Sequence, residues 1–296
     1  MQIREALRWG HETLLLSSDS ARLDAEVLLS HVLKKPVTFL LAHNEQKICS
    51  FLHFGRNDKT KLIFFPLWQY KRLIYKRKKG MPVAYLTGHK EFFFLDFEVN
   101  KNVLIPRPDT EILVEAVIDY IKGLRTKDYG LSPILLDIGT GSGCIPISVC
   151  KNVKGVEAIA MDVSSAALRV AKRNVKKHKL TSRITLVLSD LLKNIPPEWL
   201  EDREVIVTAN LPYIPAGFQV SPDLAYEPPI SLYGGTDGME VYRRLTDQVR
   251  TLKPRALFFE LFDHQIALLK TKLPDYRLKY VKDMSGEARV LVMERK

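Results

Sequence analysis

The fold is decided by the stretch Ile134-Leu135-Leu136-Asp137-Ile138-Gly139-Thr140-Gly141-Ser142-Gly143. A short β-rich run leads into a glycine-dense turn, and apolar residues resume at Ile145, Ile147 and Val149. Glycines at a strand-to-helix junction permit positive φ angles and a close approach of a ligand to the backbone. Such turns serve dinucleotides, phosphates or nucleosides. The terminal Gly-Lys-Ser/Thr of a P-loop does not follow, so the sequence disfavours nucleoside triphosphate binding.

Strands and helices alternate around this turn. Strands are predicted at 133–138, 156–161, 183–188, 205–210, 256–261, 277–282 and 288–294, and helices begin near 143, 164, 238 and 263. Another helix is predicted from Thr110, after the start signals Pro108 and Asp109. The alternation predicts an α/β fold with a mostly parallel sheet covered on both faces. The last two strands have no helix between them and are expected to pair as an antiparallel hairpin.

Polar residues and glycines follow four of these strands. Gly139 to Gly143, Asp162, Asp190 and Asn210 all fall at carboxyl ends, where ligands bind in parallel sheets. Asp162 comes about twenty positions after the glycines, where an acidic side chain hydrogen-bonds ribose hydroxyls. The alternative role for Asp162 is to cap the helix that begins near Ser164. The pattern therefore predicts one shared pocket.

The tetrapeptide Asn210-Leu211-Pro212-Tyr213 follows the apolar run 205–209. The Asn210 side chain offers one acceptor and two donors. Pro212 biases Leu211 toward an extended backbone, which directs the Leu211 carbonyl outward, and the Tyr213 ring adds a flat wall. These groups are suited to holding a planar NH2 group by two acceptors and one face. The alternative is a proline-containing turn after a core strand.

In this order, these motifs resemble a class I S-adenosylmethionine-dependent methyltransferase. Further blocks resemble the HemK/PrmC family, whose members methylate the side-chain amide nitrogen (N5) of a glutamine in peptide chain release factors. The resemblance covers nearly the whole chain. Its blocks are Arg22 to Leu29, Gly80 to Gly88, Leu104-Ile105-Pro106-Arg107-Pro108-Asp109-Thr110-Glu111, Tyr226-Glu227-Pro228-Pro229 and Gly234 to Arg244. It implies a Rossmann-like sheet with an antiparallel last strand, plus a small N-terminal all-α domain.

The resemblance also implies roles for single residues. Gly139, Thr140, Gly141, Ser142 and Gly143 are expected to line the methionine part of the cofactor, Asp162 to bind its ribose, and Asp190 with Leu191 to lie near the adenine. Asn210 is expected to lie near both cofactor and substrate. Asn210, Leu211, Pro212 and Tyr213 are expected to be catalytic, with the Asn210 side-chain oxygen and the Leu211 carbonyl accepting the two amide hydrogens of the glutamine. Arg107 and Glu227 are expected near the substrate, although helix capping, a rigid linker or a plain turn would also explain their segments.

One residue departs from the family pattern. The family usually has Asn-Pro-Pro-Tyr, whereas this chain has Leu211 at the second position. Asn-Leu-Pro-Tyr is similar to the motif of rRNA adenine dimethyltransferases, so an RNA adenine-N6 methyltransferase is an alternative function. A second alternative is a non-catalytic cofactor-binding module that docks on translation factors, but pure binding requires neither Asn210 nor Tyr213. The implied main function is methyl transfer to the glutamine of a Gly-Gly-Gln motif.

The first part of the chain is predicted to be helical. Amphipathic helices are expected around 2–16, over 21–33 and over 68–79, with a break at Pro36-Val37-Thr38-Phe39. We therefore assign residues 1–80 to a helical substrate-recognition domain, 81–108 to a linker hairpin and 109–296 to the S-adenosylmethionine-binding domain. Residues 49–68 do not match the family and are interpreted as an insertion or a divergent helix pair.

The charge and cysteine content of the chain limit the classes of partner it is expected to bind. The chain of 296 residues has a net charge of +11, and residues 1–80 carry 15 Lys and Arg against 7 acidic residues. This excess favours an acidic or nucleic-acid partner, or else marks only a solvated helix face over 71–79. The motifs favour a release factor over RNA.

Cys49, Cys144 and Cys150 fit neither a disulfide set nor a metal site. We expect a cytoplasmic monomer with no bound metal, no membrane segment and no signal peptide.

Overall fold

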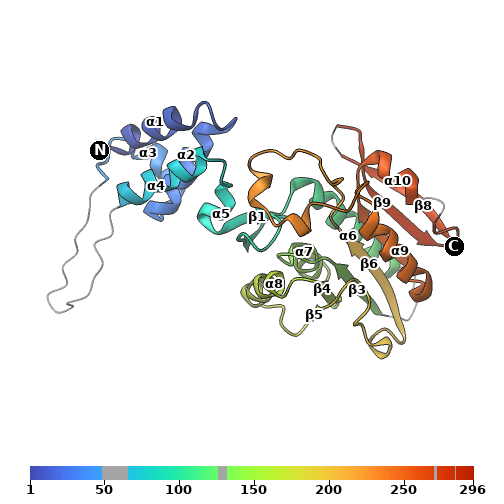
Figure 1. Cartoon of the computed structure of the whole chain (residues 1–296). Helices are drawn as coiled ribbons and strands as arrows, with labels where there is room; N and C mark the ends of the chain where they lie inside the picture. The colour runs from blue at the N-terminus through green and yellow to red at the C-terminus, as the bar shows by residue number, and fades with distance from the viewer. Residues whose placement is uncertain (49–65, 126–131, 270–271, 284) are drawn as a thin grey trace. The chain divides into compact units, whose positions relative to one another are not determined.

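The computed structural model describes residues 1–48, 66–125, 132–269, 272–283 and 285–296 (Figure 1). The chain forms two compact units. The first consists of Met1–Gly88 together with Ser221–Tyr226, and the second of His89–Val220 and Glu227–Lys296. The interpretation of 49–68 as an insertion falls mostly outside the described residues, because only its last three residues are described, where they begin a helix.

The first unit is helical, as predicted. Its helices are α1 (Ile3–Leu14), α2 (Ala21–Leu33), α3 (Val37–Ala42), α4 (Pro66–Lys78) and α5 (Val83–Thr87). The expected break at Pro36 to Phe39 was wrong in extent, because Pro36 is the extended residue before α3 and Val37 to Phe39 are helical. Proline suits this position, because the residue before a helix donates no intrahelical hydrogen bond and proline lacks an N–H. The short helices α3 and α5 gave too little periodicity to be predicted.

Tyr70 lies at the centre of this unit. Its ring is fully buried among Ile3, Leu28 and other apolar side chains of α1, α2 and α4. The Tyr70 hydroxyl donates to the Ala6 carbonyl at 3.2 Å, which satisfies its polar atom. Gly10 makes room for this contact, because a Cβ at Gly10 would come within 2.0 Å of the Tyr70 hydroxyl oxygen.

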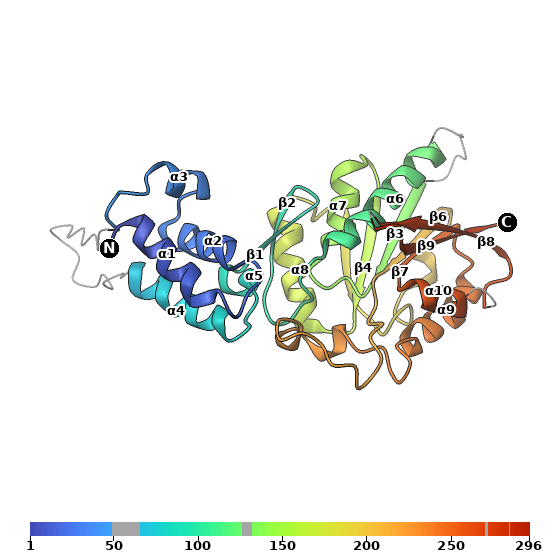
Figure 2. The same ribbon diagram turned by 90° about the horizontal axis from the view of Figure 1, so that it is seen from above.

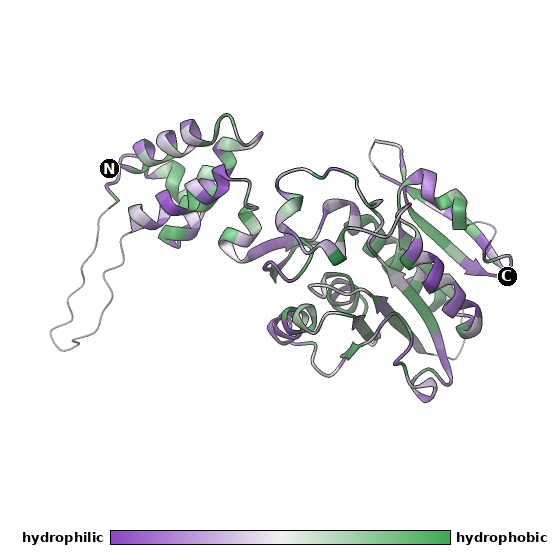
Figure 3. Ribbon diagram, viewed as in Figure 1, coloured by the Kyte–Doolittle hydropathy of each residue, from purple (hydrophilic) through white to green (hydrophobic). Residues whose placement is uncertain are grey.

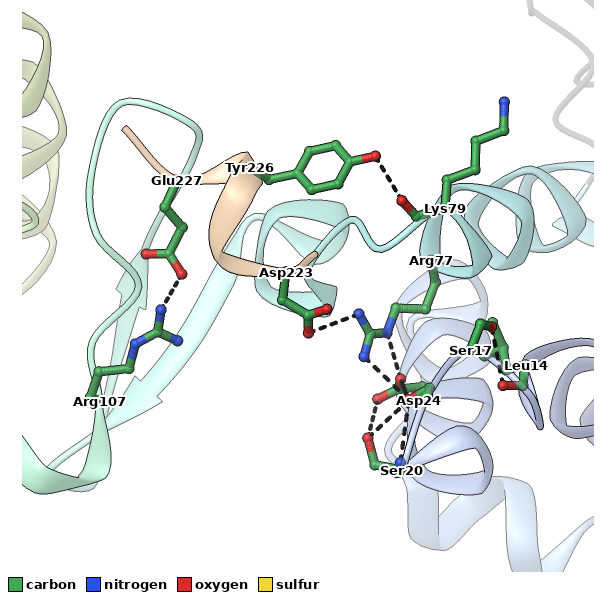
Figure 4. Close-up of polar contacts among 11 residues, drawn as sticks. Leu14, Ser17, Ser20, Asp24, Arg77, Lys79, Arg107, Asp223, Tyr226 and Glu227 are labelled. Atoms are coloured by element: carbon green, nitrogen blue, oxygen red, sulfur yellow. Dashed lines mark hydrogen bonds and ion pairs between the residues drawn. The ribbon is translucent and has the colours of Figure 1, made fainter. Parts of the chain in front are cut away.

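A buried ion pair joins the helices to the segment 221–226. Arg77 of α4 donates to Asp24 of α2 at 2.6 Å and to Asp223 at 3.1 Å, as Figure 4 shows. Ser18 and Ser20 also donate to the Asp24 carboxylate. The Tyr226 hydroxyl donates to the Lys79 carbonyl at 3.0 Å. This segment therefore belongs to the helical unit by its contacts, although its sequence neighbours belong to the other unit.

The second unit is built on a seven-stranded sheet (Figure 2). A hairpin of β1 (His89–Phe92) and β2 (Leu95–Glu98) precedes it, within the range 81–108 that the sequence assigns to a linker hairpin. The sheet order is β5-β4-β3-β6-β7-β9-β8. Only β9 runs antiparallel to its neighbours, and β8 and β9 form the predicted hairpin. The strands are β3 (Ser132–Ile138), β4 (Glu157–Asp162), β5 (Ile184–Leu188), β6 (Arg203–Ala209), β7 (Ala256–Glu260), β8 (Tyr276–Lys282) and β9 (Ala288–Arg295).

Helices cover both faces of the sheet. One face packs against α6 (Pro108–Arg125), α7 (Cys144–Asn152) and α8 (Ser165–Lys177), and the other against α9 (Glu240–Leu252) and α10 (Asp263–Leu269). The strands are coloured largely hydrophobic in Figure 3, as expected for a sheet buried on both sides. Short 3₁₀ turns lie at Pro197–Trp199, Leu224–Tyr226 and Pro229–Ser231. The mostly parallel α/β fold is confirmed.

The strand order places a switch point at β3. The chain moves from β3 to β4 on one side, and β6 lies on the other side of β3. A crevice opens outside the carboxyl ends where the order reverses, and ligands bind there. The ends of β3, β4 and β6 carry Gly139, Asp162 and Asn210, so the topology brings these predicted residues to one edge.

Candidate active site

A pocket of about 240 Å³ lies at this edge of the sheet, entirely within the second unit. The predicted residues that line it are Gly139, Gly141, Asp162, Asp190, Leu191, Asn210, Leu211 and Pro212. Asn102, Val103, Leu104, Pro228, Ile230, Ser231, Tyr233, Val241 and Arg244 also line it. The pocket is thus closed partly by the segment before α6 and partly by the loop that follows β6.

The glycine turn lies against the pocket through its backbone. Gly139, Gly141 and Gly143 have φ angles of 72°, 56° and 81°, which side chains with a Cβ rarely adopt. The Thr140 N–H donates to the Met161 carbonyl at 2.8 Å, which ties the turn to β4. Only Gly139 and Gly141 reach the pocket, whereas Thr140, Ser142 and Gly143 are buried behind them. Those three residues therefore shape the turn rather than line the pocket.

Asp162 is held by two backbone donors. Its carboxylate accepts from Gly141 N–H at 2.9 Å and from Ser164 N–H at 2.8 Å. Burial raises the pKa of Asp162. The hydrogen bonds from Ser164, Gly141 and Val163 oppose this shift, but the pKa stays above its ordinary value. The cap of α8 is Ser164, whose hydroxyl accepts from Ala167 N–H at 3.2 Å. The capping alternative for Asp162 was therefore wrong, and its carboxylate faces the pocket with acceptor capacity left.

Asp190 and Leu191 form another part of the pocket wall. The Asp190 carboxylate pairs with Lys193 at 2.7 Å and with Arg244 at 2.5 Å. The hydrogen bond from Lys193, followed by that from Arg244, lowers the pKa of Asp190. Leu191 is buried and has a φ angle of 57°, an uncommon conformation for a side chain with a Cβ.

Asn210 and Leu211 are fixed by buried hydroxyl groups. Asn210 Nδ2 donates to Thr110 Oγ1 at 3.0 Å. Leu211 N–H donates to Tyr242 Oη at 3.1 Å, and the Leu211 side chain packs so close to Gly139 that a Cβ there would lie 2.8 Å from it. Leu211 is only 4% exposed. The position that departs from the family pattern is therefore tightly held.

Pro212 and Tyr213 are held through their carbonyl groups. Cβ atoms at Gly234 and Gly238 would lie 2.3 Å from the Pro212 carbonyl oxygen and 2.1 Å from that of Tyr213. The Tyr213 carbonyl also accepts from Gln265 Nε2 at 2.8 Å. The Tyr213 ring packs edge-on to Phe262 with centroids 4.8 Å apart, and burial raises the Tyr213 pKa. The tetrapeptide is therefore a rigid loop rather than a simple turn.

Arg107 and Glu227 do not line the pocket but pair with each other (Figure 4). Glu227 is only 2% exposed, and its second oxygen accepts from Ile105 N–H at 3.0 Å. The pair joins the segment before α6 to the loop after β6. Both segments contribute residues to the pocket lining, so the pair joins two parts of the pocket wall.

Comparisons with known proteins agree with this geometry. Residues 5–50 match the family model described as the PrmC N-terminal domain, and residues 130–211 match a methyltransferase domain. A release factor glutamine methyltransferase of Rhodopirellula baltica is 35% identical over 289 residues, covering 94% of this chain and 90% of the relative. One of Clostridium acetobutylicum is 39% identical over 262 residues, covering 87% and 84%.

The chain belongs to the release factor glutamine methyltransferase family. The resemblance inferred from the sequence is confirmed over nearly all of the chain. Among solved structures, the hMettl16 catalytic domain in complex with MAT2A 3′UTR hairpin 6 has a TM-score of 0.53 at 17% identity, covering 77% of this chain and 81% of that one. At this identity the likeness shows the fold alone, which is that of a methyltransferase.

Several buried residues of this methyltransferase site were missed by sequence reasoning. Burial raises the pKa of Asp137 to about 6 and that of Glu260 to about 7. The Asp137 carboxylate accepts from Thr208 at 2.8 Å at the base of the glycine turn. A lone carboxylate inside an apolar strand was the available signal for both residues. Cys144 and Cys150 are buried in α7 as expected, and burial raises both pKa values to about 12.

Two further findings concern metals and membranes. Among the described residues, no three His, Cys, Asp or Glu side chains gather as a metal site would require. None of the helices in the described ranges is long and apolar enough to cross a membrane.

Proposed function

We propose that this protein transfers a methyl group from S-adenosylmethionine to the side-chain amide nitrogen of a glutamine in a peptide chain release factor. The observation that carries this proposal is the paired placement of Asn210 and Leu211 at the pocket edge. Asn210 and Leu211 are adjacent in the chain, and both residues line the same pocket as Gly139 and Asp162. Family membership supports the same substrate, since the relatives are named for it.

The pocket residues fit the cofactor. The Asp162 carboxylate is oriented by two N–H groups and suits a ribose diol, because each oxygen can accept a second hydrogen bond. Gly139 and Gly141 present backbone without side chains, which suits the methionine part. The wall around Leu191 and Val163 suits an adenine ring. When bound, S-adenosylmethionine supplies an electrophilic methyl group on a sulfonium.

The chain contributes orientation to the reaction. An amide nitrogen is a poor nucleophile because its lone pair is delocalised into the carbonyl. Asn210 Oδ1 and the Leu211 carbonyl accept the two amide hydrogens of the glutamine and direct its nitrogen toward the methyl group. Orientation of this kind contributes up to roughly 7–11 kcal/mol of barrier reduction. Pro212 and Tyr213 bound the amide plane.

The same two acceptors stabilise the charge that develops. As the N–C bond forms and the C–S bond breaks, the amide nitrogen gains positive charge, which carbonyl dipoles at hydrogen-bond distance stabilise. The proton then leaves the alkylated nitrogen for solvent. No general base is required before attack, since alkylation makes the nitrogen acidic.

The N-terminal helical region is the proposed docking part for the release factor. Its excess of 15 basic over 7 acidic residues within 1–80 suits an acidic surface or a ribosome-associated protein. We propose that the protein acts as a monomer in the cytoplasm, where release factors work. Sedimentation of the purified chain tests whether it is a monomer.

The test uses S-adenosylmethionine with a labelled methyl group and either a release factor containing Gly-Gly-Gln or ribosomal RNA. Label on the release factor glutamine is expected. Asn210→Ala is expected to reduce transfer by roughly 100-fold or more, with S-adenosylhomocysteine binding nearly unchanged. Asn152→Ala at the exposed end of α7 is the matched control and is expected to keep full activity.

Each other outcome has a definite meaning. Label on RNA alone would replace the glutamine assignment by the RNA alternative. Label on neither substrate would favour the non-catalytic binding module. Strong activity in Asn210→Ala would refute its acceptor role.

A further inference from the structure

Glu260 is a buried carboxylate without a role in the reaction as proposed. It ends β7 beside Asn210, is 3% exposed, and does not line the pocket. Among the described residues its Oε2 atom has no hydrogen-bond partner. A buried carboxylate is costly unless it is paired, so its presence at this strand end calls for a function.

Thr110 and Asn210 face this carboxylate. Both side chains form hydrogen bonds to Glu260, and Asn210 Nδ2 also donates to Thr110 Oγ1 at 3.0 Å. A carboxylate accepts only, so the Thr110 hydroxyl hydrogen points to Glu260 and its lone pairs are available to Asn210. Both hydrogens of the Asn210 amide are thereby directed inward. This leaves Oδ1 as the amide atom available to the pocket, which Asn210 lines.

We propose that Glu260 and Thr110 are positioning residues, which lock the Asn210 amide so that its oxygen rather than its nitrogen meets the substrate amide. The inference rests on the proposed function of Asn210. Rotating the amide by half a turn would place Oδ1 against a carboxylate and a hydroxyl oxygen, which is repulsive. The negative charge behind Nδ2 also polarises the amide, so Oδ1 becomes a better acceptor for the charge that develops on the substrate nitrogen.

The lock depends on the ionised form of Glu260. Burial raises the Glu260 pKa to about 7, although the hydrogen bonds from Thr110 and Asn210 and the charge of Arg289 oppose the shift. Below this pKa the protonated carboxyl becomes a donor and no longer enforces one amide orientation. Activity is therefore expected to rise with pH through about 7. The other groups that interact with Glu260 are Asp109 of α6, Tyr213, Tyr242 of α9 and Cys144 of α7.

The first test is a pH profile of methyl transfer to the release factor. Glu260→Gln is expected to lower kcat by roughly 10- to 100-fold above pH 7 and to remove the rise near pH 7, with S-adenosylhomocysteine affinity unchanged. Thr110→Val is expected to lose activity and Thr110→Ser to regain it, because serine keeps the hydroxyl. Glu294→Gln near the end of β9, where the side chain is partly exposed and pairs with Lys279, is the matched control and keeps the wild-type profile.

The second test needs no substrate. The Asn210 side-chain NH2 signal, assigned by its absence in Asn210→Ala, is expected to titrate with a midpoint at about 7 in the wild type and not in Glu260→Gln. An Asn210 signal that does not move through this pH range would overturn the inference even if the enzyme methylates release factors. Failure of the release factor to accept methyl groups, with the titration present, would count against the proposed function alone.

Discussion

At the scale of single residues, Leu211 shows how a departure from a family motif is accommodated. A proline at this position has no N–H, whereas Leu211 donates to Tyr242 Oη at 3.1 Å. The Tyr242 hydroxyl in turn donates to the Glu260 carbonyl at 2.7 Å. This single hydroxyl therefore ties the ends of β6 and β7 together. The backbone carbonyl is present with either residue, so the acceptor that the proposed mechanism requires is retained.

Leu211→Pro is expected to keep methyl transfer within a few-fold while lowering the free energy of unfolding by about 1–3 kcal/mol. The loss comes from the missing N–H and from the side-chain volume removed next to Gly139. Urea unfolding and the transfer assay measure the two effects. Tyr242→Phe removes the same hydrogen bond from the other side. If Leu211→Pro and Tyr242→Phe have additive effects, the bond contributes nothing and the explanation is wrong.

At the scale of elements, the loop between β6 and α9 is built around the tetrapeptide 210–213. The turn at Gly234 to Gly238 packs its backbone directly against the carbonyls of Pro212 and Tyr213. Ile214 N–H donates to Leu232, and Gly234 N–H donates back to Ile214, both at 2.9 Å. Two blocks more than twenty residues apart in the sequence thus form one rigid structure.

Gly238→Ala is expected to lower the free energy of unfolding by about 2–4 kcal/mol and to impair methyl transfer. Gly238 has a φ angle of 76°, and its added Cβ would lie 2.1 Å from the Tyr213 carbonyl oxygen. Gly217→Ala is the matched control, because Gly217 has a φ angle of 87° but no atom within 4 Å of its Cβ. That control is expected to cost about 1–2 kcal/mol. Equal losses in thermal unfolding of the two variants would show that the close contact has no effect.

Most of the sheet was predictable because strand patterns report local burial. The runs 133–138 and 205–210 are apolar, since parallel strands are buried on both faces, and their ends carried the polar residues that meet at the pocket. The antiparallel hairpin followed from the missing helix between the last strands. Asp162 and Asn210 were predicted to share one edge of the sheet, because the carboxyl ends of neighbouring parallel strands lie side by side.

The remaining parts depend on contacts that a local pattern does not contain. Glu260 ends an apolar strand, and nothing in the sequence around it indicates that Thr110 and Asn210 lie beside it. Thr140 and Ser142 were expected in the pocket, yet both are buried, whereas Gly139 and Gly141 beside them line the pocket. Nothing in the sequence near Asp223 indicates its partner Arg77, because the two are 146 residues apart.

At the scale of the whole molecule, the helical unit is made from two distant stretches of the chain. Arg77 is 7% exposed and Asp24 is 6% exposed, so their pair is shielded from water, whereas the third partner Asp223 is half exposed. Removing one member of such a pair leaves an uncompensated buried charge. The stability of this unit is therefore expected to depend on Arg77 more than on any surface pair.

Arg77→Ala is expected to lower the free energy of opening of α2 and α4 by about 3–5 kcal/mol, because Asp24 is left buried and unpaired. Arg22→Ala is the matched control, since the Arg22 side chain is 78% exposed and pairs with Glu26 one turn away on α2. Its effect is expected to be about 0.5 kcal/mol or less. Amide hydrogen exchange resolves both helices separately from the sheet. Similar protection in the two variants would contradict the importance of the buried pair.

The placement of residues 221–226 in the helical unit also affects the timing of folding during synthesis. Asp223 follows Arg77 by 146 residues, and Tyr226 follows Lys79 by 147. At about 5–20 residues per second, a ribosome needs roughly 7–30 s to cover that distance. Strands β3 to β6 are made in this interval. The helical unit is therefore begun first but completed late, after much of the sheet has left the ribosome.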